Sequence, residues 1–200
     1  MIELVAAPAL GLGLGILTGM PLGVVNVAII DASLAGRVRF ATGIGLGGAL
    51  ADTAHAALGF IGVGALLTTR PELMRWFAIG AGVLIVAYVA RAWRTRAQPR
   101  ISVDDSSLAR GVVIGCGLTL PNPGALAAWV AVAASLWPDA SVAEATTIAA
   151  GVGIGSACWF ALLARWMSRV RPDHPAIPIL SRVALVALVG IAIVGVARTI

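Results

Sequence analysis

The sequence contains no lysine, two cysteines, one tyrosine and few charges of either sign. Charged residues make up 12% of the 200 positions, against about 25% in a typical soluble domain. The two cysteines form no Cys-x-x-Cys pair, and no cluster of metal-ligating side chains accompanies them, so neither a metal nor another cofactor is expected. The apolar runs are long and aperiodic, which excludes collagen, a coiled coil and a disordered chain.

Apolar residues dominate the composition. They account for 60% of the chain, glycine adds 24 positions, and the mean hydropathy is +0.98. A helix that crosses a bilayer needs ~20 residues, so six of them nearly exhaust the chain. The composition therefore predicts one integral membrane domain over residues 1–200, with no room for a soluble catalytic domain. The start at Met1 has no basic region before its apolar run, so we expect a first span there and not a cleaved signal peptide.

Six apolar segments are visible between short polar turns. The longest polar stretch, residues 94–107, divides them three and three. We predict an all-α membrane protein whose transmembrane spans are Leu4–Ile30, Phe40–Leu67, Met74–Trp93, Leu108–Leu136, Val142–Val170 and Ile179–Ala197.

All fourteen basic residues are arginine, and most lie at the ends of apolar runs. This pattern is typical of membrane orientation, and it argues against a nucleic-acid partner despite the net charge of +5. Positive charge favours the cytoplasmic side. We therefore expect a multi-pass protein of a bacterial cytoplasmic membrane, with both termini outside. Three arginines lie on the outer side, and eleven lie on the inner side: Arg37, Arg39, Arg91, Arg94, Arg96, Arg100, Arg110, Arg165, Arg169, Arg171 and Arg182.

The chain resembles itself over two halves, residues 1–93 and 108–200. Matches in spans one and four lie 102 residues apart, those in spans two and five 108, and those in spans three and six 107. Three spans per half give the halves opposite orientations, which is the inverted-repeat plan of secondary transporters. The matched positions in spans one and four are Gly13, Gly15 and Pro21 with Gly115, Gly117 and Pro123.

Proline interrupts spans one and four at corresponding places. Pro21 lies in Gly-Met-Pro-Leu-Gly, and Pro123 lies in Leu-Pro-Asn-Pro-Gly with Asn122 before it. Paired helix breaks point to a substrate site near the midplane of the bilayer. A simple kink at each proline is the alternative, in which Asn122 only repairs the break.

Two polar residues lie deep in the second span. Asp52 and His55 are three positions apart and share a helix face. An ionisable group at this depth is costly, so both should face the interior of the bundle, where they bind substrate or carry a proton. The alternative is a structural hydrogen bond between helices. We expect Asp31 to be a solvated residue near the inner end of the first span.

Other features favour packing. The Gly-rich runs in spans one and two allow close contact between helices, and the two cysteines are expected to pack. Trp129 and Trp159 lie deeper than the remaining tryptophans, where they line a cavity or fill the core.

The run from Gly19 to Asp52 resembles the N-terminal signature of the LysE/RhtB lysine exporter family. That signature has a Pro-Gly-Pro break, a Gly about fifteen residues later and a Gly-rich helix that ends in an acidic residue. Gly36 and Asp52 occupy those places here, but Pro21-Leu22-Gly23 replaces Pro-Gly-Pro. The segment from Pro121 to Gly124 resembles a second signature, in which Lys follows Asn-Pro.

The resemblance implies a six-helix exporter of amino acids or similar small metabolites, driven by protons. It points to Pro21, Asp52, Asn122 and Pro123 as site residues, and the residue types add His55 and Trp129. A divalent-cation exporter of the same architecture, a membrane thiol-redox protein and a structural role remain alternatives. The expected partners are a small-molecule substrate, protons and lipid, and the short chain leaves room for a homodimer.

Overall fold

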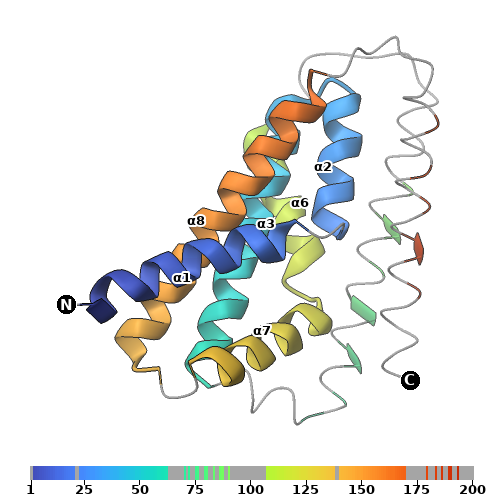
Figure 1. Ribbon diagram of the computed structural model, residues 1–200. Coiled ribbons are helices and arrows are strands. Elements are labelled where there is room, and N and C mark those ends of the chain that lie inside the picture. Colours follow the sequence, from blue (N-terminus) through green and yellow to red (C-terminus); the bar gives the residue numbers. More distant parts are fainter. Residues whose placement is uncertain are drawn as a thin grey trace.

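The structure is a computed structural model that describes residues 2–20, 23–62, 107–137 and 140–169, with isolated positions among 70–90 and 179–193. In this part the elements are α-helices, so the predicted all-α class is confirmed. The helices are α1 (Ile2–Gly19), α2 (Val24–Leu34), α3 (Val38–Phe60), α6 (Leu108–Thr119), α7 (Pro123–Leu136) and α8 (Val142–Met167) (Figure 1).

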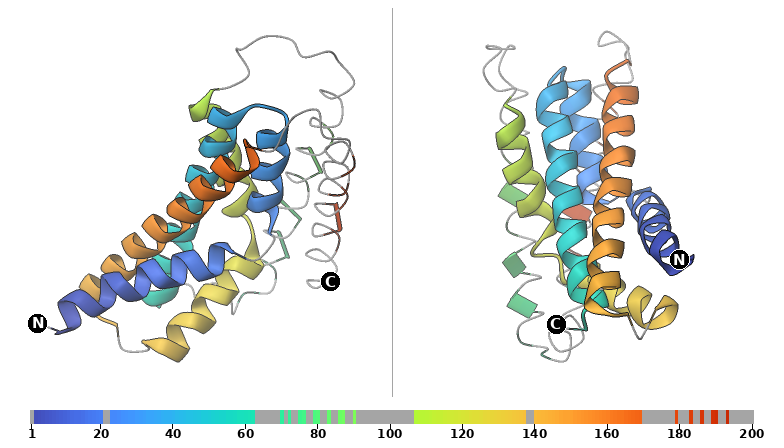
Figure 2. Two further views of the ribbon diagram at one scale, coloured as in Figure 1. Left: turned by 45° about the horizontal axis from the view of Figure 1, so that its top comes forward. Right: turned by 90° about the vertical axis from the view of Figure 1, so that its left-hand side faces the viewer.

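Four of these helices form a row, in the order α6, α3, α8, α1 (Figure 2, right). The central pair is antiparallel, because Gly45 of α3 lies against Phe160 of α8 while Thr53 lies against Gly153. Each outer helix runs parallel to its inner neighbour. Helix α2 covers α3 and α8, and α7 packs on the far end of α3.

Glycines hold α1 against α8. A Cβ atom on Gly15 would overlap the carbonyl oxygen of Val152, and one on Gly155 would overlap that of Leu12. Gly11 and Gly151 meet in the same way one turn earlier. Small residues four apart let two helix backbones touch inside a membrane, where packing replaces the hydrophobic effect between helices.

A second glycine crossing joins α3 to α6. A Cβ atom on Gly47 would overlap the carbonyl oxygen of Val112, and one on Gly115 would overlap that of Ile44. Gly43 and Gly111 meet one turn earlier. The Gly-rich runs therefore have the packing role that their spacing predicted.

The segments that contain the predicted spans one and four each consist of two helices. Helix α1 ends at Gly19 and α2 begins at Val24, with a bend of 67° between Ala6–Gly19 and α2. Helix α6 ends at Thr119 and α7 begins at Pro123.

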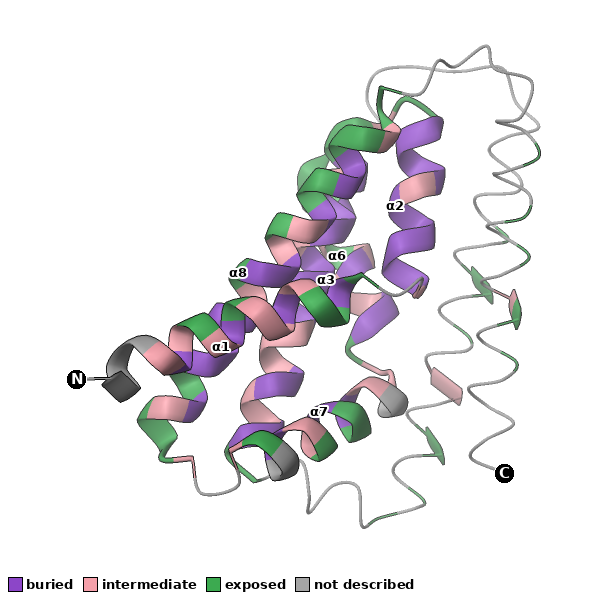
Figure 3. Cartoon of the chain, in the orientation of Figure 1, coloured by how far each residue is buried: buried purple, intermediate pink, exposed green. Residues whose placement is uncertain are grey.

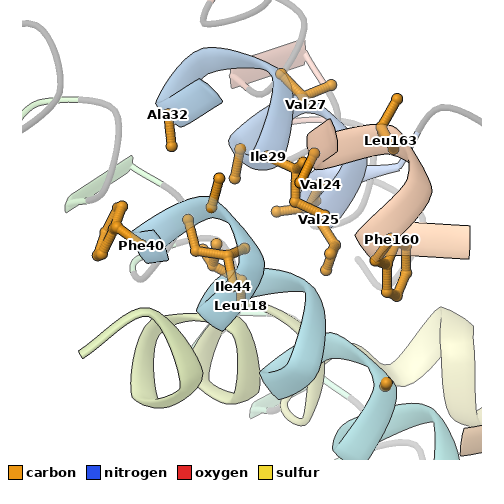
Figure 4. Packing of buried hydrophobic residues seen from close by; sticks show 14 residues of the cluster. Val24, Val25, Val27, Ile29, Ala32, Phe40, Ile44, Leu118, Phe160 and Leu163 are labelled. Carbon is orange, nitrogen blue, oxygen red and sulfur yellow. The ribbon is translucent and has the colours of Figure 1, made fainter. Parts of the chain in front are cut away.

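The main apolar core lies where α2 meets α3, α6 and α8. Figure 3 shows that α2 is buried along nearly its whole length. Figure 4 shows Val25 and Ile29 of α2 beside Ile44 of α3, Leu118 of α6 and Phe160 of α8. A smaller cluster, which includes Phe60 and Trp129, lies at the opposite end of α3.

A tight turn links α2 to α3. Gly36 has a φ of +77°, a left-handed conformation that glycine adopts without a Cβ clash. The amide of Arg37 donates to the carbonyl of Ala32 at 3.0 Å, and that of Gly36 donates to Ser33 at 2.9 Å. These are the bonds of a Schellman cap, which explains why the sequence needs glycine here.

Among the described residues, α8 is long and apolar enough to cross a bilayer alone, and the bent pair α1–α2 passes the same test as a second span. The predicted third and sixth spans fall mostly outside the described residues.

Candidate functional site

The carboxyl group of Asp52 lies where three helices meet. The hydroxyl of Ser156, on α8, donates to Oδ2 of Asp52, on α3, at 2.8 Å. The same hydroxyl lies 3.2 Å from the carbonyl oxygen of Gly15, on α1. The close glycine crossing of α1 and α8 brings Gly15 to Ser156, and the packing of α3 against α8 brings Asp52 to the same hydroxyl. We call Asp52, Ser156 and Gly15 the polar junction.

His55 lies one turn beyond Asp52 on α3 and faces the second helix break. Its Nε2 donates to the carbonyl oxygen of Leu120 at 3.1 Å. A carbonyl only accepts, so Nε2 carries a hydrogen, and in the neutral ring Nδ1 is then an acceptor. The side chain is 3% exposed, and Nδ1 has no hydrogen-bond partner among the described residues. His55 thus satisfies a carbonyl freed at the end of α6.

At the first break, the side chain of Asn26 satisfies the free backbone carbonyl. Its amide nitrogen donates to the carbonyl oxygen of Gly19, the last residue of α1, at 2.8 Å. The indole nitrogen of Trp159, on α8, donates to Oδ1 of Asn26 at 3.1 Å. Backbone groups freed inside a membrane need such partners.

Asn122 directly precedes α7, the helix after the second break. Its side-chain oxygen accepts from the backbone N–H of Ala125 at 3.4 Å, and its own backbone N–H donates to the carbonyl of Thr119 at 2.9 Å. The first bond is that of a helix N-cap. Asn122 is partly buried and follows by two residues Leu120, whose carbonyl His55 satisfies.

The other predicted site residues lie apart from this junction or outside the description. Trp129 is buried in the smaller apolar cluster, and its backbone touches Gly59, so it packs in the core of the described part. Pro123 is the first residue of α7, with its side chain outside the described set, and Pro21 lies outside the described residues.

The structure also corrects the expectation for Asp31. This side chain is 0% exposed within α2, and Oδ2 lies 3.9 Å from the guanidinium of Arg37. The Schellman turn at Gly36 folds Arg37 back over the end of α2. Arg37 also lies 5.0 Å above the ring of Phe40. Asp31 is therefore a buried, paired residue and not a solvated one.

Sequence reasoning missed Ser156 and Asn26 as functional candidates. Asn26 is a lone amide in an otherwise apolar run, which is a usable signal in a membrane span. Ser156 follows a Gly-x-Gly-x-Gly run, where a small polar residue looks like one more packing position.

A family model described as LysE type translocator matches residues 16–199 of the chain. No curated protein and no solved structure matches. The family match covers helices α2, α3, α6, α7 and α8 but only residues 16–19 of α1, so Asp52 and Ser156 of the polar junction lie inside the matched region and Gly15 lies just before it.

Proposed function

Because the chain belongs to the LysE type translocator family, we propose that this membrane exporter of amino acids or similar small metabolites works by proton antiport. Asp52 is the acid at which proton and substrate compete. The observation that carries this proposal is the polar junction, which puts an ionisable side chain between three helices of the bundle.

A carboxyl group in this position is costly unless its function offsets the cost. The neutral carboxyl is compatible with the apolar surroundings, and the ionised one attracts a cationic amine. One group that alternates between a proton and an amine is the minimum that antiport needs. His55, one turn away, faces the second break with a free ring nitrogen and offers substrate an acceptor.

The two helix breaks support a site between them. Each break leaves a carbonyl that a side chain from another helix satisfies, Gly19 by Asn26 and Leu120 by His55. Discontinuous helices of this kind line binding sites in secondary transporters. We propose that the substrate site lies near the midplane of the bilayer, between α1, α3 and the α6–α7 break and beside Asn122. Helix α8 also belongs to this site, because its Ser156 contacts Asp52.

The packing supports an inverted repeat. The crossing of α1 with α8 uses Gly15 and Gly155, and the crossing of α6 with α3 uses Gly115 and Gly47. These positions correspond at 100 residues for α1 and α6 and at 108 for α3 and α8. The packing thus favours a spacing of 100 in the first span of each half, where sequence matching gave 102. On this spacing Pro21 corresponds to Pro121.

The helix directions agree with the proposed topology of six alternating spans. Such a chain has spans one and five parallel, spans two and four parallel, and spans two and five antiparallel. The pairs α1–α8, α3–α6 and α3–α8 have those directions. We propose that both termini are outside and that the 94–107 loop is cytoplasmic. A cysteine-accessibility map that found this loop outside the cell would overturn the orientation.

Divalent-cation export has less support. In the described part of the chain, no group of three or more His, Cys, Asp or Glu side chains is placed to hold a metal ion. Asp52 and His55 face different neighbours, Ser156 and Leu120, and do not meet at one point.

The test is Asp52→Asn in proteoliposomes. The vesicles are loaded in parallel with labelled L-lysine, a cationic probe, and L-leucine, a neutral one, and efflux is measured with and without a proton gradient. We expect a gradient-driven flux of at least one probe in the wild type and no gradient dependence in Asp52→Asn.

Glu144→Gln is the control, since Glu144 lies in the first turn of α8 and caps that helix with Ser141. It should leave the proton dependence unchanged. Wild-type efflux in Asp52→Asn at every pH would make Asp52 a structural residue and overturn the mechanism.

A further inference from the structure

The hydroxyl of Ser156 faces two acceptors that lie on different helices. It is 2.8 Å from the carboxyl of Asp52 and 3.2 Å from the carbonyl of Gly15, and the side chain is 0% exposed. A serine hydroxyl has one hydrogen to donate and two lone pairs to accept with. Its hydrogen therefore serves one of the two acceptors at a time.

The charge of Asp52 decides which acceptor receives that hydrogen. An ionised carboxylate only accepts, and a bond to it is stronger than a bond to a neutral carbonyl. A protonated carboxyl carries its own hydrogen, which it donates to the oxygen of Ser156. The serine hydrogen is then released to the carbonyl of Gly15.

We propose that Ser156 is a positioning residue that passes the charge state of Asp52 to α1. In the neutral state the hydrogen bonds run from Asp52 to Ser156 to Gly15 and tie α1 to α8. In the ionised state the serine hydrogen turns to Asp52, and the tie between the two helices is lost. The inference rests on the proposed role of Asp52 as the coupling acid.

The position of Gly15 in α1 determines what this change in hydrogen bonding affects. Gly15 lies one turn before Gly19, where α1 ends, and in an α-helix its carbonyl is the acceptor for the amide of Gly19. A tie at Gly15 thus acts on the last turn before the first break. The protonation state of Asp52 therefore affects the last turn of α1, where the proposed substrate site begins.

The other half of the molecule lacks the relay at the same positions. Phe160 and Gly48 stand 108 residues from Asp52 and Ser156, and an edge carbon of the Phe160 ring lies 3.3 Å from where a Gly48 Cβ would be. The carbonyl of Gly115, which corresponds to that of Gly15, accepts the hydroxyl of Thr119 from its own helix at 3.0 Å. The relay is therefore a feature of one half and not of the shared packing.

Among the described residues, few other titratable groups lie near the polar junction. Within a turn of Asp52 on α3 there is His55, whose Nε2 is held by Leu120. On α6 the thiol of Cys116 donates to the carbonyl of Gly47 at 3.3 Å, and α7 has no titratable side chain. The remaining ionisable residues in the helices packed against α3 lie on its neighbours α2, α6 and α8: Asp31, Arg110, Glu144, Cys158 and Arg165.

The experiment is a double-substitution cycle read by hydrogen exchange. Wild type, Asp52→Asn, Ser156→Ala and the double variant are purified in lipid nanodiscs without ligand. Exchange of the α1 peptide that ends at Gly19 is followed at one alkaline pH, where a carboxyl is ionised. Asn resembles a neutral carboxyl in shape and donates to Ser156 from its amide.

We expect exchange in this peptide to be about fivefold slower in Asp52→Asn than in the wild type, which corresponds to one net hydrogen bond of ~1 kcal/mol. Ser156→Ala should abolish this difference. Measuring the wild type at acidic pH, where Asp52 is neutral, should reproduce it once the pH dependence of intrinsic amide exchange is divided out. Thr119→Ala is the matched control, because it removes the hydroxyl from the corresponding carbonyl of the other half. It should leave the Asp52→Asn effect intact.

Two results would overturn the relay. One is an Asp52→Asn effect that persists in the Ser156→Ala background, and the other is no Asp52→Asn effect on the end of α1. Either of these leaves the proton coupling of Asp52 intact if the proteoliposome assay shows that Asp52→Asn loses gradient-driven efflux. Gradient-driven efflux by Asp52→Asn would instead refute the proposed function itself.

Discussion

The two glycine crossings have the same packing but different chemistry. Where α1 crosses α8, the neighbouring α3 supplies Asp52, and Ser156 connects it to the backbone of α1. Where α6 crosses α3, the corresponding positions hold Phe160 and Gly48 in apolar contact. On the proposed inverted repeat, a shared scaffold thus carries an ionisable junction in one half only. The difference indicates that the glycines are required for helix packing and that the polar residues Asp52 and Ser156 are required for function.

The largest expected effect comes from making the polar half resemble the apolar one. The double substitution Asp52→Phe and Ser156→Gly copies the pair Phe160 and Gly48. We expect the protein to insert and to keep its thermal stability, because Ser156→Gly provides the room that Gly48 provides in the other half. Gradient-driven efflux should fall to background in the proteoliposome assay. Retained proton-coupled efflux would mean that the two halves differ without consequence.

The glycine crossings should respond alike in both halves. Gly15→Ala and Gly115→Ala each put a Cβ atom onto a backbone carbonyl, which no side-chain rotation relieves. Overpacking of this kind costs about 1–3 kcal/mol. We expect similar losses in the midpoint of thermal unfolding for both variants. Gly13→Ala is the control, since its Cβ would meet no atom within 4 Å. A large loss in one half alone would contradict the equivalence of the crossings.

The two breaks allow a finer comparison, because each carbonyl has a different partner. Asn26→Leu and His55→Leu remove the donors to Gly19 and Leu120, and each should cost about 1 kcal/mol of stability, measured by denaturant titration. His55→Gln keeps a donor for Leu120 and should recover that loss. If His55→Gln is stable but alters the proton dependence of efflux, then His55 does more than repair the break.

The smallest effect concerns how the two central helices begin. Helix α8 starts with a capping box, in which Ser141 and Glu144 bond each other's backbone, whereas α3 has Arg37 at its N-cap position and no side-chain cap. Ser141→Ala should lower stability by about 0.5–1 kcal/mol. Efflux should be unchanged, because the cap lies at the end of α8 far from Ser156. Altered proton dependence in this variant would show that the polar junction senses the start of the helix.

The sequence was sufficient to predict what lies within single helices. The all-α class, the Gly-rich contact faces and the deep polar pair Asp52 and His55 follow from composition, spacing and the cost of charge in lipid. The family match confirms the resemblance that the two proline-containing signatures suggested.

The sequence did not predict which residues on different helices contact each other. Nothing local selects Ser156 for Asp52 or Leu120 for His55, because those pairings depend on which helices cross and at what register. The same limit applies to the spacing between the first spans of the two halves, where the sequence matches predict 102 and the proposed packing equivalence favours 100, since many Gly and Pro matches fit almost equally well. Asp31 was misjudged because its environment depends on a turn that brings Arg37 back over it.

The most direct test of the central claim is proton release on substrate binding. The purified protein is mixed with the amino acid that the efflux assay identifies, in a weakly buffered solution that contains a pH-sensitive dye. If proton and substrate compete at Asp52, then the wild type releases protons in proportion to the substrate bound, and Asp52→Asn releases none. Equal proton release by both proteins, or substrate binding to the wild type without any release, would contradict the account.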